Sequence, residues 1–211
     1  MTQIERNWQY VEQFPAQSDA VQRARKLSLE LGVEPVSAAT AAHLAQLSQL
    51  TRARQICEIG TGVGVSGIAL LSLNDEADLT TIDIESEHLK AAKENYAAAG
   101  IAIPRIRTIA GDALLVLPRM NLNSYDLVLV DADPASMLEY VEHALKIVRP
   151  GGLIAVPHAL WQGKVADPTA RDTITTDFRT LLEEIATSAA VSSTLSPVGD
   201  GLLSIVKREL A

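Results

Sequence analysis

The chain has 211 residues, of which 47% are hydrophobic and 21% charged, and its formal net charge at pH 7 is −8. This composition is typical of a globular protein, and the length predicts one domain with a substantial core. The negative charge argues against a general nucleic-acid-binding surface, because phosphates would be repelled. The single cysteine, Cys57, excludes an internal disulfide. With no signal core and no apolar run of bilayer-spanning length, the sequence predicts a cytoplasmic protein without a membrane partner.

Residues 1–50 are predicted to be helical. Ser18 is a candidate N-cap for a helix that Gly32 ends, and Pro35 leads into a second helix over residues 38–50. We expect this segment to form a helical cap. The pattern leaves open whether the cap covers a sheet edge, a substrate cleft or a dimer partner.

From residue 53 onward, short apolar segments alternate with amphipathic helical patterns. One helical pattern follows a candidate cap at Ser86, and another ends before Pro150. This alternation predicts a doubly wound α/β fold, a mostly parallel sheet with helices on both faces and a ligand site beyond the carboxyl ends of its strands. The predicted strands of this part are residues 54–59, 79–84, 105–109, 126–130 and 153–156.

The last part of the chain follows a different pattern. A helix with an apolar face is expected over residues 174–185, and two further strands over 190–195 and 202–207. Residues 196–201 are too few for a crossover, so these two strands should pair antiparallel. No linker or repeat interrupts the sequence, which predicts one domain over residues 1–211, with the core at 53–211.

A glycine-rich turn, Glu58–Ser66, joins the first predicted strand to a helix. Glycines allow backbone N–H groups to approach a ligand, and a helix N-terminus favours an anionic group there. Gly62, Gly64 and Gly67 match the dinucleotide fingerprint, and Asp83 stands where a carboxylate accepts ribose hydroxyls. Such a carboxylate suits any cofactor that carries a ribose. An NAD-dependent oxidoreductase is therefore one alternative.

The acid at Glu58, followed by alternating glycines, resembles the first motif of class I S-adenosylmethionine-dependent methyltransferases. The predicted terminal hairpin also resembles the end of their Rossmann-like sheet. That sheet has seven strands in the order 3-2-1-4-5-7-6, with the last strand antiparallel. The resemblance implies that the turn wraps the methionine part, that Asp83 holds the ribose and that Gly111 begins an adenine-contacting segment. The cofactor-binding residues implied in this way are Glu58, Gly60, Thr61, Gly62, Gly64, Ser66, Asp83, Asp112, Ala113 and Asp131.

A closer resemblance, from about residue 33 to the end, is to the short bacterial branch of the caffeoyl-CoA and catechol O-methyltransferase-like family. It is carried by the turn described above together with segments 81–83, 111–113, 125–133, 149–152, 160–165 and 199–202, in the family's order and spacing. The resemblance implies methyl transfer to the hydroxyl of a small phenol- or catechol-like acceptor. It also implies a homodimer.

The sequence departs from the metal-dependent members of that family. Asp131 matches their first metal ligand, but Pro157 and His158 replace an Asp-Asn ligand pair, and Pro134 replaces a lysine that can assist deprotonation. A hard cation such as Mg²⁺ prefers oxygen ligands, and proline offers none. Asp131, Asp133 and His158 together could suit a transition metal. We favour metal-free transfer, and no metal ligand is predicted.

Without a metal, a phenol would still benefit from a general base. His158 follows the fifth predicted strand and Asp131 ends the fourth, so both should face one cleft. We predict that His158 is the base and that Asp131 orients it or faces the sulfonium. The alternative is a strand-end histidine bonded to backbone, or a binding protein with a degenerate catalytic site.

Trp161 occupies the loop that walls the acceptor pocket in the family, although ordinary packing of the ring is an equal alternative. The other three histidines, His43, His88 and His143, fall within helical patterns. They are expected to be surface or packing residues.

Overall fold

A computed structural model describes residues 2–209. Its centre is a seven-stranded sheet in the order β3-β2-β1-β4-β5-β7-β6, which is the order that the methyltransferase resemblance implied. Strands β1 to β5 pair in parallel, and β7 runs antiparallel to both β5 and β6. The strands are β1 (Gln55–Ile59), β2 (Asp78–Asp83), β3 (Ile106–Ala110), β4 (Tyr125–Val130), β5 (Val148–Val156), β6 (Val191–Ser196) and β7 (Leu202–Lys207).

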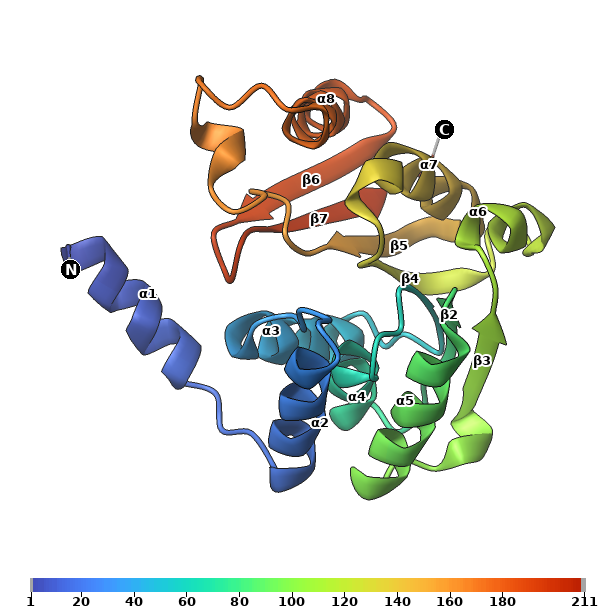
Figure 1. Ribbon diagram of the computed structural model, residues 1–211. Helices are drawn as coiled ribbons and strands as arrows, with labels where there is room; N and C mark the ends of the chain where they lie inside the picture. The colour runs from blue at the N-terminus through green and yellow to red at the C-terminus, as the bar shows by residue number, and fades with distance from the viewer. Residues whose placement is uncertain (1, 210–211) are drawn as a thin grey trace.

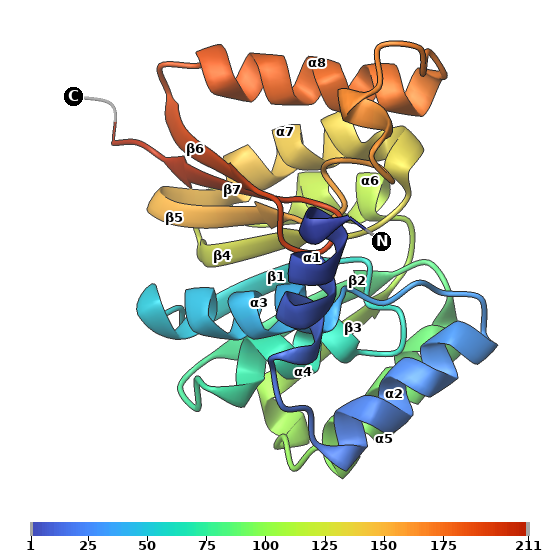
Figure 2. The same cartoon turned by 90° about the vertical axis from the view of Figure 1, so that its left-hand side faces the viewer.

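Helices cover both faces of the sheet (Figures 1 and 2). On one face lie α3 (Ala38–Leu50), α4 (Val65–Ser72) and α5 (Ser86–Ala98), with α2 (Asp19–Glu30) beside them; on the other lie α6 (Ala113–Val116), α7 (Met137–Ile147) and α8 (Thr173–Thr187). Four short 3₁₀ helices complete the described chain, at Ile103–Arg105, Leu117–Arg119, Pro134–Ser136 and Lys164–Ala166. None of the helices within residues 2–209 is long and apolar enough to cross a membrane.

The sheet separates two apolar cores. Cys57 and Ile59 of β1 pack into the core beneath α7 and α8, while Ile56 packs into the core beneath α4. All three side chains are fully buried. A strand buried on both faces needs apolar residues at successive positions, which is why these segments appear as continuous apolar runs.

Two predicted boundaries were wrong. β5 begins at Val148 and not at residue 153, because Val148 already pairs with Tyr125 of β4 and Arg149 donates to the Asp126 carboxylate at 2.6 Å. Ser86 is the first residue of α5 and not its cap. The backbone N–H of the preceding residue, Glu85, donates instead to the carboxylate of Asp83 at 2.9 Å.

The N-terminal helices differ in how firmly they attach. Ser18 caps α2 as predicted, and α2 and α3 pack on α4. Helix α1 (Gln3–Gln13) buries none of its residues and stands apart from the sheet in Figure 1. It is held through Glu12, whose carboxylate accepts from the Ser37 hydroxyl at 2.9 Å and from the Ala39 backbone N–H at 3.2 Å.

Candidate active site

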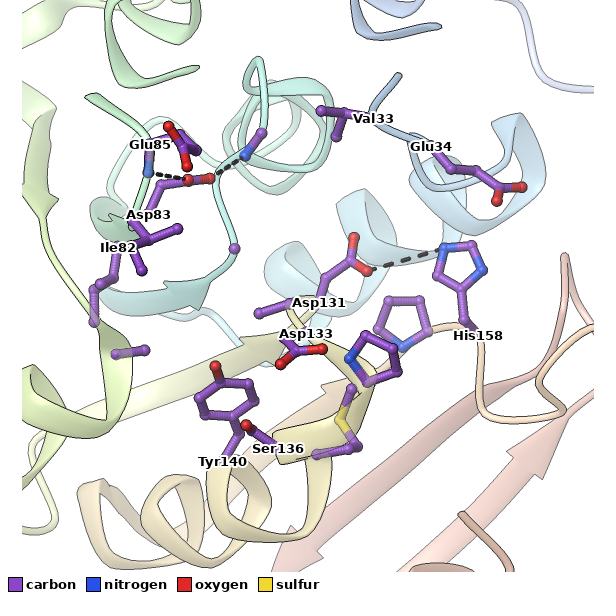
Figure 3. Close-up of a pocket in the computed structure, with 18 of the residues that line it drawn as sticks. Val33, Glu34, Ile82, Asp83, Glu85, Asp131, Asp133, Ser136, Tyr140 and His158 are labelled. Atoms are coloured by element: carbon purple, nitrogen blue, oxygen red, sulfur yellow. Dashed lines mark hydrogen bonds and ion pairs between the residues drawn. The ribbon is translucent and has the colours of Figure 1, made fainter. Parts of the chain in front are cut away.

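A cavity of about 740 Å³ opens beyond the carboxyl ends of the parallel strands (Figure 3). Each of the first five strands sends the loop that follows it into the wall, and α7 closes the floor with Met137 and Tyr140. This is the edge where the predicted doubly wound fold places its ligand. The sequence-predicted residues that line the cavity are Gly60, Gly62, Asp83, Asp112, Ala113, Asp131, His158 and Trp161.

The glycine-rich turn is held close to the end of β4. Gly60 has φ +90°, and a Cβ there would overlap the carbonyl oxygen of Asp131. The Asp131 backbone N–H in turn donates to the Ile59 carbonyl at 2.8 Å. Gly64, with φ +88°, is the N-cap of α4. Only glycine avoids the clash with Asp131 at position 60. Because Gly60 has no side chain, its backbone groups can be approached by a ligand that fills the cavity.

Asp83 fastens the turn to β2. One carboxylate oxygen accepts backbone N–H groups from Thr61 at 3.1 Å and Gly62 at 2.8 Å, and the other accepts from Glu85 at 2.9 Å. His88 Nδ1 lies 3.5 Å from this carboxylate and lines the same cavity. His88, expected to be a surface or packing residue, is a partly exposed residue of the cavity wall. Its helical pattern gave no signal of the cavity.

Glu58 lies beneath the turn and is fully buried, outside the wall of the main cavity. Its two oxygens accept the hydroxyls of Ser66 and Thr81, both at 2.6 Å, and Thr81 is 2.5 Å from the hydroxyl of Thr61. Burial raises the pKa of Glu58 to about 8, although these hydrogen bonds act in the opposite direction. Ser66 and Thr61 instead line a small recess of about 50 Å³ that Gly60 and Asp131 share with the main cavity.

The segment after β3 is fixed by its own cap. Asp112 is the N-cap of α6 and accepts from the Leu114 backbone N–H at 2.8 Å. Ala113 follows with 8% of its surface exposed. Both residues line the cavity together with Tyr140 of α7, which Figure 3 shows below Asp83.

His158 and Asp131 meet at the opposite end of the cavity, as predicted from their strand positions. His158 Nε2 lies 3.9 Å from an Asp131 oxygen, and both side chains keep about a quarter of their surface exposed, at 24% and 22%. Burial raises the pKa of Asp131, and the neighbouring imidazole opposes that rise. The Nδ1 atom of His158 is 4.0 Å from Asp200, a residue that the sequence analysis did not select.

Trp161 both packs and lines the cavity. Its ring stacks on Phe178 of α8 with centroids 5.4 Å apart and an interplanar angle of 18°. Both rings contribute to the cavity wall. The two interpretations left open by the sequence are therefore compatible, because one face of the ring packs while the residue still borders the cavity.

The donor set at this end of the cavity does not fit a hard divalent cation. Pro157 supplies no ligand atom, and neither does Pro134, which begins a 3₁₀ helix. Across residues 2–209, no group of three or more His, Cys, Asp or Glu side chains is arranged to hold a metal ion.

A second cavity of about 530 Å³ adjoins the first and shares Glu34, His158 and Asp200 with it. Its outer wall includes Trp8 and Val11 of α1. Sequence reasoning missed Glu34 and Asp200 because neither belongs to a regular element. Figure 3 shows Glu34 facing the His158 ring across this junction.

Comparison with known proteins agrees with this geometry. Residues 17–208 match the sequence profile of a family described as O-methyltransferase. A Mycobacterium marinum protein named as an O-methyltransferase is 43% identical over 185 residues, which cover 87% of this chain and 83% of that protein. A Corynebacterium glutamicum crystal structure superposes with a TM-score of 0.90 at 29% identity, over 100% of this chain and 99% of the other. The Streptomyces achromogenes O-methyltransferase TomG, solved in complex with S-adenosylmethionine, gives 0.85 at 28% identity, over 99% and 100% of the two chains.

Proposed function

The chain belongs to the O-methyltransferase family, uses S-adenosylmethionine as methyl donor, and we propose that it methylates the hydroxyl of a small phenol- or catechol-like acceptor without a divalent metal. The observation that carries the metal-free proposal is the pair His158 and Asp131, 3.9 Å apart, at the place where Pro157 has removed a ligand position. An imidazole at this position can activate the acceptor hydroxyl by accepting its proton, whereas a cation would activate the hydroxyl by stabilising the negative charge on its oxygen.

The cofactor would occupy the cavity along its glycine-rich wall. Gly60, Gly62 and the recess beside Ser66 would hold the methionine part, and Asp112 and Ala113 would border the adenine. Asp83 would accept a ribose hydroxyl. A carboxylate offers about four acceptor positions, and backbone N–H groups occupy three of them here, which leaves about one for the ribose.

The bound cofactor supplies an electrophilic methyl group. His158 would accept the proton that the acceptor hydroxyl loses as its oxygen bonds to that methyl carbon, while the bond from the methyl carbon to sulfur breaks and the sulfur leaves as the neutral thioether of S-adenosylhomocysteine. Asp131 then lies beside an imidazolium, where its negative charge is stabilising, or faces the cofactor's positive charge. The acceptor would lie at the junction of the two cavities, with Trp161 as one wall and Glu34 opposite.

Two measurements test this proposal. Calorimetric titration with S-adenosylhomocysteine and with NAD should show binding of the first alone. A methyl-transfer screen over catechols, phenols and hydroxy acids should then show turnover that EDTA does not reduce. His158→Ala should lower kcat on a responsive phenol about 100-fold or more, while the control His143→Ala, on α7 outside both cavities, should not.

Each alternative has its own outcome in these measurements. Cofactor binding without turnover on any acceptor would identify a degenerate binding protein. Turnover abolished by EDTA would contradict the metal-free mechanism, and an unaltered rate in His158→Ala would contradict the base assignment.

We also propose that residues 1–211 act as one cytoplasmic domain that forms a homodimer. Ile4 and Trp8, one turn apart on the same face of α1, are 63% and 53% exposed, and Phe14 just beyond the helix is 77% exposed. Neighbouring exposed apolar side chains of this kind mark protein-interaction surfaces. Light scattering after size exclusion should give twice the 22.6 kDa chain mass. Trp8→Asp should yield the monomer, whereas Gln13→Asp on the same helix should not. A monomeric wild type would refute the homodimer and would leave the proposed methyl transfer untouched.

A further inference from the structure

Asp200 belongs to the segment Gly199–Leu202, which matches the family yet received no role from the sequence. It lies in the turn between β6 and β7 and lines both cavities. Its carboxylate is 4.0 Å from His158 Nδ1, while Asp131 is 3.9 Å from Nε2 of the same ring. The imidazole therefore stands between two carboxylates, one at each nitrogen.

The loop that carries Asp200 and the loop that carries His158 are hydrogen-bonded to each other. Ala159 donates to the Gly201 carbonyl at 3.0 Å and Leu160 to the Asp200 carbonyl at 2.9 Å. The Gln162 backbone N–H donates to the Asp200 carboxylate at 2.6 Å. A Cβ at Gly201 would come within 2.8 Å of the Leu160 backbone nitrogen, so the loops approach as closely as glycine allows. Asp200 thus has a fixed position relative to the ring.

A neutral imidazole has one N–H and one lone pair, and its neighbours decide which nitrogen carries which. If Asp200 accepts the N–H of Nδ1, the lone pair of Nε2 faces Asp131 and the main cavity. If Asp131 accepts instead, the lone pair faces away from the cofactor and the ring cannot serve as base there.

We propose that Asp200 is a positioning residue, which holds the His158 ring with its Nε2 lone pair directed at the acceptor hydroxyl. This inference rests on the proposed role of His158 as base. The Asp200 oxygen that takes the Gln162 N–H has a second lone pair for Nδ1–H. The 4.0 Å gap is about 1 Å longer than a hydrogen bond, and such contacts in catalytic sites commonly tighten when substrate binds.

Other charged groups line the two cavities that meet at this ring and must stay constant in the test. They include Glu12 of α1, Arg25 of α2, Glu34 before α3, and Asp131 and Asp133 after β4. A variant at Asp200 leaves all five in place. Comparison with the matched Asp131→Asn variant then separates the two carboxylates at the ring.

The test is ¹⁵N NMR of the histidine rings in the full chain, which needs no acceptor. The chain has four histidines, and His158→Ala assigns the signal. Wild type should show His158 protonated at Nδ1 in its neutral form. Asp200→Asn should shift the population towards the Nε2–H tautomer. An unchanged tautomer in Asp200→Asn would overturn the proposal. A shift of the tautomer in Asp131→Asn but not in Asp200→Asn would overturn it as well.

Kinetics give a second readout on any acceptor found in the screen. Asp200→Asn should lower kcat about tenfold and move the acid limb of the pH profile to lower pH, with the KM for S-adenosylmethionine unchanged, and Asp200→Glu should recover part of the rate. If Asp200→Asn leaves kcat and its pH profile unchanged while His158→Ala is inactive, the positioning role of Asp200 is refuted and the role of His158 as base is not. If Asp200→Asn does not fold, Asp200→Glu decides: a partial shift towards the Nε2–H tautomer with a partly reduced kcat supports the proposal, and a wild-type tautomer with a wild-type kcat refutes it.

Discussion

At the scale of single residues, Glu58 makes a prediction about pH. The folded chain holds the pKa of this buried carboxyl at about 8, against an ordinary value of 4.5. The folded state therefore binds the proton more tightly than the unfolded state. The resulting stabilisation is fully present below pH 4.5 and is lost as pH rises towards 8, by up to about 1.4 kcal/mol per pH unit.

Glu58→Gln should remove that dependence, because an amide does not titrate. Urea unfolding at intervals between pH 5 and pH 8 would measure it: the wild type should lose stability as pH rises, and the variant should change much less. Glu94→Gln, on the exposed face of α5, should keep the wild-type slope. Equal slopes in wild type and Glu58→Gln would show that another group carries the pH dependence.

Gly60 makes a prediction about the cofactor wall. Gly60→Ala combines a left-handed backbone with overlap of the Asp131 carbonyl, so we expect a loss of about 3 kcal/mol or more and weaker binding of S-adenosylhomocysteine. Gly100→Ala is the matched control, with φ +79° but nothing within 4 Å of the added Cβ. It should cost about 1 kcal/mol and leave binding intact. Similar losses of stability in both variants would mean that the left-handed backbone conformation, and not the clash with the Asp131 carbonyl, causes the destabilisation.

At the scale of elements, the loop after β5 depends on α8. Phe178 is 1% exposed and stacks on Trp161, so it joins the helix to the loop that carries His158. Phe178→Ala should cost about 3–5 kcal/mol and should also raise the KM of the acceptor, because the Trp161 wall loses its support. Phe178→Leu should restore most of the stability. Chemical denaturation and steady-state kinetics measure the two effects, and an unchanged acceptor KM would show that the loop holds its shape without the ring.

The sequence and the structure agree best where an element is buried on both sides. Apolar runs such as Asp126–Val130 predicted their strands to within a residue, because few other structures can bury them. The start of β5 was missed because Pro150 and Gly151 resemble a turn, whereas pairing of Val148 with Tyr125 outweighs that local preference. Helix α1 has no apolar face in contact with the core, so no burial pattern could define it.

The candidate site likewise contains residues that the sequence could predict and residues that it could not. Gly60, Asp83 and Asp131 were found because strand ends and glycine spacing mark positions in the chain. Asp200 and Glu34 come from loops far apart in sequence, and only the folded chain brings them to His158. Spacing cannot reveal such contacts, since it reports neighbours along one element and not across two loops.

At the scale of the whole molecule, negative charge is concentrated in the wall of the main cavity. The net charge is −8, and the main cavity is lined by seven carboxylate side chains. No lysine or arginine of the described chain stands among its lining residues. S-adenosylmethionine carries a net positive charge, so the cavity favours it electrostatically. The same field acts on the acceptor.

We therefore expect the charge of the acceptor to set its rate. Among catechols, kcat/KM should decrease from dopamine, which carries an ammonium group, through uncharged catechol to protocatechuate, which carries a carboxylate. The spread should reach about tenfold at low salt and shrink as ionic strength rises, because salt screens the field. Glu34→Gln, at the junction of the two cavities, should narrow the spread, whereas Glu94→Gln on the exposed face of α5 should leave it unchanged. A preference for protocatechuate that persists at high salt would mean that a specific contact, and not the field of the cavity, selects the acceptor.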